Sequence, residues 1–182
     1  RTPDKTAIVW EDRRITYAEL QSRTWRLANA LLDSGSDGLV VTGTTGEGPT
    51  LSNEEKIRLY AEVKEAIGGR GAVIAGTTDN NTANSIELSK EAEAVGADAL
   101  LLTVPAYNKP PQEGLYQHFK KIASKTNLPC LLYNVTSRTS LNMTDETTIR
   151  LSQIDNIVGI KEAGSDLDQI ARIIEGAQED FL

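Results

Sequence analysis

The feature that most constrains the fold is the alternation of short apolar runs with longer amphipathic stretches. The runs are rich in β-branched residues and continuously apolar, which is typical of strands buried on both faces of a parallel sheet. They lie at residues 6–10, 38–42, 72–76, 97–104, 129–135 and 156–161. The pattern predicts an α/β fold of six parallel strand–helix units with right-handed connections.

Helix starts are marked by a hydroxyl residue followed three positions later by an acid, which is the capping-box pattern or its aspartate variant. The three pairs are Thr16 and Glu19, Ser52 and Glu55, and Ser165 and Asp168. We therefore expect helices to begin just after residues 16, 52 and 165.

The first unit differs from the others. Residues 1–35 contain the strand TAIVW, a charged turn at residues 11–14 and a second short run at residues 14–16, followed by a helical stretch. A β-hairpin is therefore predicted before the first helix, whereas each later unit is a plain strand, loop and helix.

Charge and cysteine content exclude several classes of protein. The net charge of −7 speaks against nucleic acid or an anionic membrane as a partner. No apolar run approaches the roughly 18 residues that span a bilayer. Cys130 is the only cysteine, which excludes an intrachain disulfide and favours a reducing, cytoplasmic location. The chain also has a single histidine, His118, which we expect on a helix surface. With one cysteine and one histidine, we predict no metal site.

Lys161 ends the last apolar run. The carboxyl ends of parallel strands are where α/β proteins bind ligands. A desolvated amine there has a lowered pKa and attacks a carbonyl to form a Schiff base. The alternative is a lysine whose ammonium reaches water or pairs with Glu162. The stretch alone leaves both interpretations open.

Other polar residues also follow strand ends. Tyr133 is suited to proton transfer, or is a core tyrosine with a satisfied hydroxyl. Thr44 and Thr45 belong to a glycine-rich loop that resembles an oxyanion cradle but lacks the lysine of a phosphate loop. Arg138 offers a planar fork to a carboxylate, or is a solvated surface residue. Because parallel strand ends meet at one edge, together these residues suggest a lysine-dependent aldolase or lyase acting on a keto acid.

Five blocks carry a family resemblance, in a fixed order and spacing. They are GTTGEGPTLS (43–52), VIAGT (73–77), PAYNKPPQEGLYQHF (105–119), LLYNVTSRT (131–139) and NIVGIKEA (156–163). From about residue 36 to residue 182 the chain resembles the dihydrodipicolinate synthase family, which are pyruvate-dependent class I aldolases. The presence of Arg138 and GTTGE favours the synthase branch over the sialic-acid lyases.

The resemblance implies a role for each candidate residue. Lys161 would form the Schiff base with pyruvate, and Tyr133 would be the central proton relay. Thr44 would link Tyr133 to Tyr107, a residue that the family lends across a tight dimer interface. The resemblance implies no cofactor beyond this covalent bond.

Two further residues would bind substrate carboxylates. By the same resemblance, Thr45 would hold the carboxylate of pyruvate, and Arg138 that of aspartate semialdehyde. The expected partners are therefore these two substrates of lysine and diaminopimelate biosynthesis, together with further copies of the chain in a homo-oligomer.

Residues 1–35 resemble instead the N-terminal segment of amino-acid adenylation domains, which predicts a chimera joined near Gly35, with residues 36–182 packing as one domain. The whole would be a (β/α)₈ barrel of TIM type lacking strands seven and eight. Such barrels typically need about 250 residues, and open sheet edges favour association.

The alternative to an active synthase is a recombined or engineered domain that folds and oligomerises without significant catalysis. An ATP-dependent adenylating module is a remote third hypothesis.

Overall fold

The structure, a computed structural model, describes residues 3–182. Its strands are β1 (Thr6–Trp10), β2 (Arg13–Thr16), β3 (Gly38–Val41), β4 (Ala72–Gly76), β5 (Ala99–Thr103), β6 (Cys130–Asn134) and β7 (Ile157–Glu162). Its α-helices are α1 (Tyr17–Asp33), α2 (Asn53–Ile67), α3 (Thr82–Ala94), α4 (Gln112–Ala123), α5 (Thr136–Thr139), α6 (Asp145–Ser152) and α7 (Leu167–Gly176). Two short 3₁₀ turns, Thr44–Gly46 and Gly48–Thr50, follow β3.

The main sheet has five strands in the order β3-β4-β5-β6-β7, and all neighbouring pairs are parallel. Each strand therefore pairs with the one that precedes it in the chain, as in a barrel. The predicted α/β class is confirmed, but the prediction of six parallel units is wrong for the described residues. The first predicted strand, β1, instead pairs antiparallel with β2 in a separate two-stranded sheet. This confirms the predicted hairpin.

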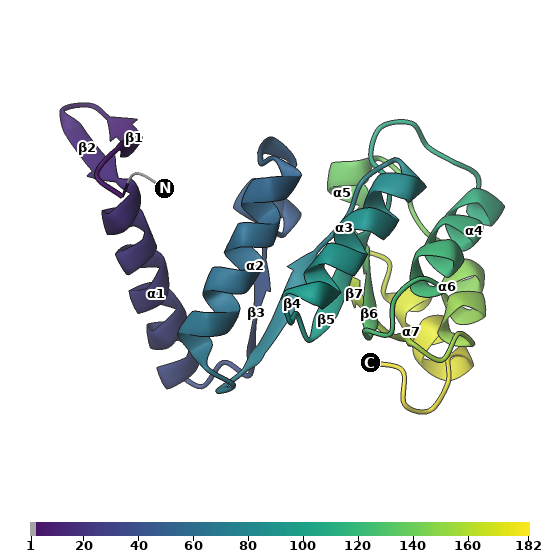
Figure 1. Cartoon of the computed structure of the whole chain (residues 1–182). Coiled ribbons are helices and arrows are strands. Elements are labelled where there is room, and N and C mark those ends of the chain that lie inside the picture. Colours follow the sequence, from purple (N-terminus) through teal and green to yellow (C-terminus); the bar gives the residue numbers. More distant parts are fainter. Residues whose placement is uncertain (1–2) are drawn as a thin grey trace.

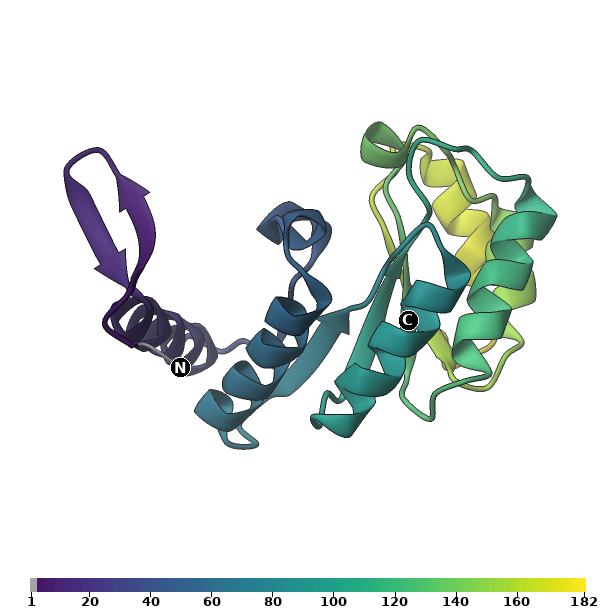
Figure 2. The ribbon, with the colours of Figure 1, turned by 45° about the horizontal axis from the view of Figure 1, so that its top comes forward.

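The core lies between the main sheet and the helices that cover one of its faces (Figures 1 and 2). Leu100 and Leu102 face this core together with Tyr60 and Phe119, all at most 1% exposed. Because side chains alternate along a strand, Leu101 points to the opposite face. There it belongs to a second, smaller cluster with Tyr133 and Val135, packed against Ile74 and Leu131.

The hairpin and α1 stand at one end of the molecule, on the far side of α2 from the rest of the sheet (Figures 1 and 2). The hairpin projects from the N-terminal end of α1, where the Tyr17 amide donates to the Lys5 carbonyl at 3.0 Å. The other end of α1 packs on α2, and Ala28 joins the main core at 4% exposure. The core therefore anchors α1 at one end only.

Capping explains where the helices begin. Thr16 and Ser52 form two of the three predicted capping boxes. The third predicted cap is wrong by one residue, because Asp166 and not Ser165 caps α7, accepting from the Gln169 amide at 3.1 Å. His118 also differs from expectation: it is 8% exposed rather than on the surface, with Nδ1 2.9 Å from the Thr82 hydroxyl.

The final residue lies along the outer edge of β7. The Leu182 amide donates to the Val158 carbonyl at 3.0 Å, and its carbonyl accepts from the Ile160 amide at 2.8 Å, which is a parallel-strand pattern. Gly159 permits this approach, since a Cβ there would lie 2.7 Å from the Leu182 oxygen. Within residues 3–182, no helix has the length and apolarity needed to cross a membrane.

Candidate active site

Three polar residues lie in one row at the carboxyl ends of β5, β6 and β7. They are the predicted site residues Tyr133 and Lys161 and their strand neighbour Thr103. Thr103 pairs in register with Tyr133, and Tyr133 pairs in register with Lys161. Residues paired across parallel strands point to the same face of the sheet. All three therefore lie on the face opposite the helices, which confirms the predicted meeting of Tyr133 and Lys161 at one edge.

Lys161 and Tyr133 are in direct contact. The Lys161 Nζ lies 4.4 Å from the centroid of the Tyr133 ring, which is a cation–π geometry. Tyr133 is 7% exposed, whereas Lys161 is exposed. The buried ring thus provides a fixed surface against which an accessible amine is held.

Thr44 approaches the same row from the 3₁₀ turn that follows β3. Its Oγ1 lies 3.4 Å from Oγ1 of Thr103, the strand neighbour of Tyr133. The Thr103 amide in turn donates a hydrogen bond to the Thr78 hydroxyl at 2.7 Å. Thr44 and Thr45 are both exposed, and the contact with Thr103 is made by Thr44. The structure therefore brings Thr44, and not Thr45, against the strand ends.

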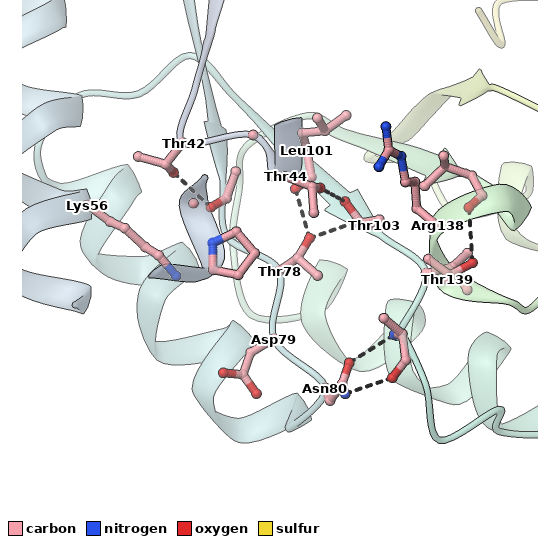
Figure 3. Close-up of a pocket in the computed structure, with 17 residues that line it drawn as sticks. Thr42, Thr44, Lys56, Thr78, Asp79, Asn80, Leu101, Thr103, Arg138 and Thr139 are labelled. Atoms are coloured by element: carbon pink, nitrogen blue, oxygen red, sulfur yellow. Dashed lines mark hydrogen bonds between the residues drawn. The ribbon is translucent and has the colours of Figure 1, made fainter. Parts of the chain in front are cut away.

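A cavity of about 370 Å³ lies beside this row, among the loops that follow β3, β4, β5 and β6 (Figure 3). Thr44 and Arg138 line it, while Lys161, Tyr133, Thr45 and Tyr107 do not. The predicted site residues are thus divided between the strand-end row, with Lys161 and Tyr133, and the neighbouring cavity, with Thr44 and Arg138. Thr103 belongs to both.

Arg138 and Tyr107 lie on two segments that are joined by a backbone hydrogen bond. Arg138 belongs to the short helix α5, and the carbonyl of Thr139 in that helix accepts from the Tyr107 amide at 3.3 Å. The Tyr107 side chain is 92% exposed, and its backbone has the unusual φ of 74°. Tyr107 therefore faces solvent in the single chain and makes no contact with Tyr133 or Thr44 there.

An amide network behind the row was missed by the sequence analysis. Asn134 Nδ2, just after Tyr133, donates to Glu162 Oε2 at 2.8 Å, just after Lys161. The same Nδ2 donates to Asn142 at 2.8 Å, and Asn142 donates to Gln169 at 2.7 Å. These bonds join the ends of β6 and β7 through groups on α7 and on the loop before α6. Nothing in residue spacing indicates them, because the partners lie far apart in the chain.

A second network supports the loop that carries Thr44. Tyr60, fully buried in α2, donates to the Gly76 carbonyl at 2.8 Å and lies 2.8 Å from the Thr42 hydroxyl. Burial raises the pKa of the Tyr60 phenol to about 12, with the Thr42 bond acting in the opposite direction. The phenol is therefore a neutral structural group below the cavity.

The remaining reactive side chains lie away from the row. Burial raises the pKa of the Cys130 thiol to about 12, so this thiol stays protonated and inert at neutral pH. Burial also lowers the pKa of His118, opposed by the charge of Asp79. Within residues 3–182 no three His, Cys, Asp or Glu side chains are grouped to hold a metal ion.

Comparison with known proteins identifies the family. The model of the dihydrodipicolinate synthetase family matches residues 17–182. The 4-hydroxy-tetrahydrodipicolinate synthase of Moorella thermoacetica is 63% identical over 157 residues, which are 86% of this chain and 54% of the relative. The enzyme of the same name from Dehalococcoides mccartyi strain CBDB1 is 58% identical over 180 residues, or 99% of this chain and 58% of the relative.

A solved structure agrees over the same region. The dihydrodipicolinate synthase of Acinetobacter baumannii, crystallised in complex with pyruvate, superposes with a TM-score of 0.83 at 44% identity, covering 85% of this chain and 53% of that one. The chain thus spans about half the length of the relatives that it matches.

The predicted chimera finds no support in these comparisons. The family match begins at residue 17, and the Dehalococcoides alignment covers 180 residues, so both run across the expected junction at residue 35. The resemblance of the hairpin segment to adenylation domains therefore does not show a separate origin. The order of the parallel strands, the row at their carboxyl ends and the match over residues 17–182 lead to one assignment: the chain belongs to the dihydrodipicolinate synthetase family.

Proposed function

We propose that this chain carries the Schiff-base chemistry of a 4-hydroxy-tetrahydrodipicolinate synthase, in which pyruvate condenses with aspartate semialdehyde. The observation that carries the proposal is the placement of Lys161 Nζ 4.4 Å from the Tyr133 ring, at the carboxyl edge of the sheet. Relatives of this name at 58–63% identity support it. Since the chain spans about half their length, the complete reaction is proposed and not established.

The chemistry needs an amine, a proton relay and a carboxylate binder. The Lys161 amine adds to the ketone carbon of pyruvate, and loss of water leaves an imine. Loss of a proton from the methyl group then gives an enamine, whose carbon attacks the aldehyde of the second substrate. Tyr133 is suited to move the protons of the addition and dehydration steps, because its ring lies against the lysine.

The other roles rest on position. Thr44 lies next to the row through Thr103 and would extend the proton relay. Arg138 lines the cavity and would bind the carboxylate of aspartate semialdehyde, whereas Thr45 would need to turn inward to bind that of pyruvate. Tyr107 would act in a neighbouring copy of the chain rather than in its own, and its 92% exposure supports this role.

One observation favours the alternative, a folded and self-associating domain without significant turnover. Lys161 is exposed and lies on the last strand of the described sheet. Condensation is efficient in a site that excludes water and holds both substrates within an angstrom of the reactive geometry. An open wall beside Lys161 would allow imine formation and still impair the second step.

Borohydride trapping separates these hypotheses. The protein is reduced in the presence of pyruvate, its intact mass is measured, and condensation is assayed with aspartate semialdehyde. We expect one reduced pyruvyl group on the native chain and on Lys121→Ala, an exposed-lysine control, and none on Lys161→Ala. An adduct without condensation would support the inactive domain, and absence of an adduct would overturn the role of Lys161.

Four expectations from the sequence stay predictions. They are the homo-oligomer, the lack of nucleic-acid and membrane partners, the cytoplasmic location, and the division of the chain into residues 1–35 and 36–182. The exposure of Tyr107 supports the first of these, because an aromatic side chain so exposed is common at contacts between subunits.

A further inference from the structure

Lys161 and Glu162 are neighbours in β7 whose side chains lie on opposite faces of the sheet. Lys161 is paired in register with Tyr133, and Glu162 with Asn134, the next residue of β6. Because side chains alternate along a strand, the lysine belongs to the strand-end row and the carboxylate to the face that the helices cover. None of the ion pairs within residues 3–182 joins the two. The ion pair considered from the sequence is therefore absent, and the acid next to Lys161 leaves its amine unneutralised.

The Glu162 carboxylate accepts hydrogen bonds from three segments of the chain. Its Oε2 accepts from Asn134 Nδ2 at 2.8 Å and from Nε2 of Gln169, on α7, at 3.4 Å. Its Oε1 accepts from the amide of Gly164, in the loop that follows β7, at 2.6 Å. One side chain thus joins the end of β7 to β6, to α7 and to the turn by which the chain leaves the strand.

The main chain of Met143 fixes the orientation of both side-chain amides. Its amide donates to Asn134 Oδ1 at 3.1 Å, so Asn134 presents its nitrogen to Glu162. Its carbonyl accepts from Gln169 Nε2 at 3.2 Å, which places that nitrogen on the same side. Asn134 and Gln169 are both buried. Each of the three partners of the carboxylate is therefore a donor, and the position requires a side chain that only accepts.

We propose that Glu162 is a positioning residue, which holds Lys161 against Tyr133 by fixing the end of β7. Lys161 is exposed, so the place of its Nζ, 4.4 Å from the Tyr133 ring centroid, depends on the strand that carries it. The catalytic part of this role rests on the proposed function, in which the Lys161 amine attacks pyruvate. Such an attack is sensitive to position, because a misplacement of about 1 Å can cost about 100-fold in rate.

Glu162→Gln is the variant that tests this role. It keeps the size of the side chain but replaces one acceptor oxygen by an NH₂ group, which must face either the Gly164 amide or the two side-chain amides. Either placement sets donor against donor and loses the hydrogen bonds on that side. Glu162→Asp keeps an acceptor-only carboxylate on a shorter side chain. Glu175→Gln, which removes an exposed acid of α7 outside the network, is the control.

The contact between the lysine and the tyrosine is measured by NMR, with the lysines labelled with ¹³C at Cε. A methylene held over the face of a tyrosine ring is shifted upfield by the ring current, and Lys161→Arg identifies the signal. We expect an upfield Lys161 signal in the native chain and in Glu175→Gln. Most of the shift should be lost in Glu162→Gln and part of it in Glu162→Asp. A loss of stability alone would leave the signal in place, because each variant is measured below its melting temperature.

Borohydride trapping of pyruvate measures the catalytic consequence. At saturating pyruvate, Glu162→Gln should form the reduced adduct at least about tenfold more slowly than the native chain, with Glu162→Asp between the two. The pyruvate concentration that gives half of the maximal rate should change less, because the carboxylate lies on the face of the sheet opposite Lys161. Glu175→Gln should match the native chain in both quantities.

The two measurements separate failure of this inference from failure of the proposed function. An upfield Lys161 signal that is lost in Glu162→Gln would support the positioning role even for a native chain that forms no adduct. An unchanged signal in folded Glu162→Gln would overturn the role, as would a native chain without the upfield signal. Where the native chain forms the adduct, an unchanged trapping rate in Glu162→Gln would overturn it too.

A second variant covers the case in which Glu162→Gln does not fold. Gln169→Met removes the donor on α7 and leaves the carboxylate of Glu162 in place. It should lose part of the upfield shift of Lys161, since β7 is then tied to β6 and to the Gly164 turn only. An unchanged shift in Gln169→Met would overturn the proposal in that case.

Discussion

At the scale of single residues, Thr42 is the point where three segments meet. Its backbone has a φ of 56°, and its carbonyl oxygen lies close to two glycines. A Cβ added at Gly48 would lie 2.1 Å from this oxygen, and a Cβ added at Gly76 would lie 2.7 Å from it. The buried Tyr60 hydroxyl lies 2.8 Å from the Thr42 side chain. The phenol and the two glycines together hold the loop that presents Thr44.

Tyr60→Phe should weaken this support in a pH-dependent way. The pKa of Tyr60 is raised to about 12 in the folded chain, whereas an unfolded tyrosine titrates near 10. Between these values the folded state binds the extra proton, so the free energy of unfolding falls as pH rises. Above pH 10, the free energy of unfolding of the native chain should fall by about 1 kcal/mol per pH unit more than that of Tyr60→Phe. At pH 8, loss of the hydrogen bonds of the phenol should lower the free energy of unfolding of Tyr60→Phe by about 1–2 kcal/mol.

Urea denaturation at pH 8, 10 and 11 measures both effects. Tyr17→Phe, a change at a half-exposed tyrosine outside the core, is the control and should follow the native curve. The buried Cys130 thiol contributes equally to all three proteins and cancels from the comparison. Parallel pH curves for the native chain and Tyr60→Phe would contradict the assignment.

At the scale of elements, the two capping boxes differ in what they support. Thr16 begins α1 beside the hairpin, where the core anchors only the far end of the helix. Ser52 begins α2, which contributes the fully buried Tyr60 and Ile67 to the core. The same capping geometry should therefore have local consequences in α1 and global ones in α2.

Thr16→Ala and Ser52→Ala test this difference. Each substitution should cost about 1 kcal/mol of helix stability. In Thr16→Ala we expect amide hydrogen exchange to accelerate in the hairpin and first turns of α1, with an unchanged free energy of global unfolding. In Ser52→Ala the global free energy should fall. A global loss of equal size in both variants would show that the hairpin unfolds together with the core.

The elements also show what the sequence could predict. Apolar runs and capping boxes identified the strands and two helix starts, because those signals arise from neighbours in the chain. The cap of α7 was misplaced because Ser165 and Asp166 both carry suitable oxygens, and only the folded backbone selects Asp166. The hairpin of β1 with β2 was predicted correctly, but the count of six parallel units that included β1 was wrong, because a short apolar run does not specify which sheet its strand joins.

The candidate site was predictable to a similar extent. Tyr133 and Lys161 meet because parallel strands align their carboxyl ends, which follows from the run pattern. Lys56, which lines the cavity and is 8% exposed, was not predicted, since a lysine in the first turn of a capped helix is usually solvated. The burial of a side chain depends on segments that are distant in the sequence. The hydrogen bond between Asn134 and Glu162 was missed for the same reason.

At the scale of the whole molecule, the face of the sheet opposite the helices remains partly uncovered. Val40 on the edge strand β3 is 50% exposed on that face, beside Ile74. An edge strand with an exposed apolar residue favours pairing with another chain. We therefore expect this 182-residue chain to self-associate.

Val40→Lys should reduce that association by placing a charge on the edge. Sedimentation equilibrium over a range of concentrations should show dimers or larger species for the native chain and a shift toward monomer for the variant. Leu167→Lys, a change at an exposed apolar residue of α7, is the control and should associate as the native chain does. A native chain that is monomeric throughout would contradict this expectation.

The consecutive order of the five parallel strands also bears on how the chain is made. Each strand from β4 onward hydrogen-bonds to a partner that was synthesised before it, so no early strand of the main sheet waits for a distant later one. The sheet can therefore grow one strand at a time as the chain leaves the ribosome, with each new helix covering its strand soon after synthesis. The strands are translated in the order in which they lie in the sheet, an arrangement that would shorten the time that an unpaired strand edge spends exposed.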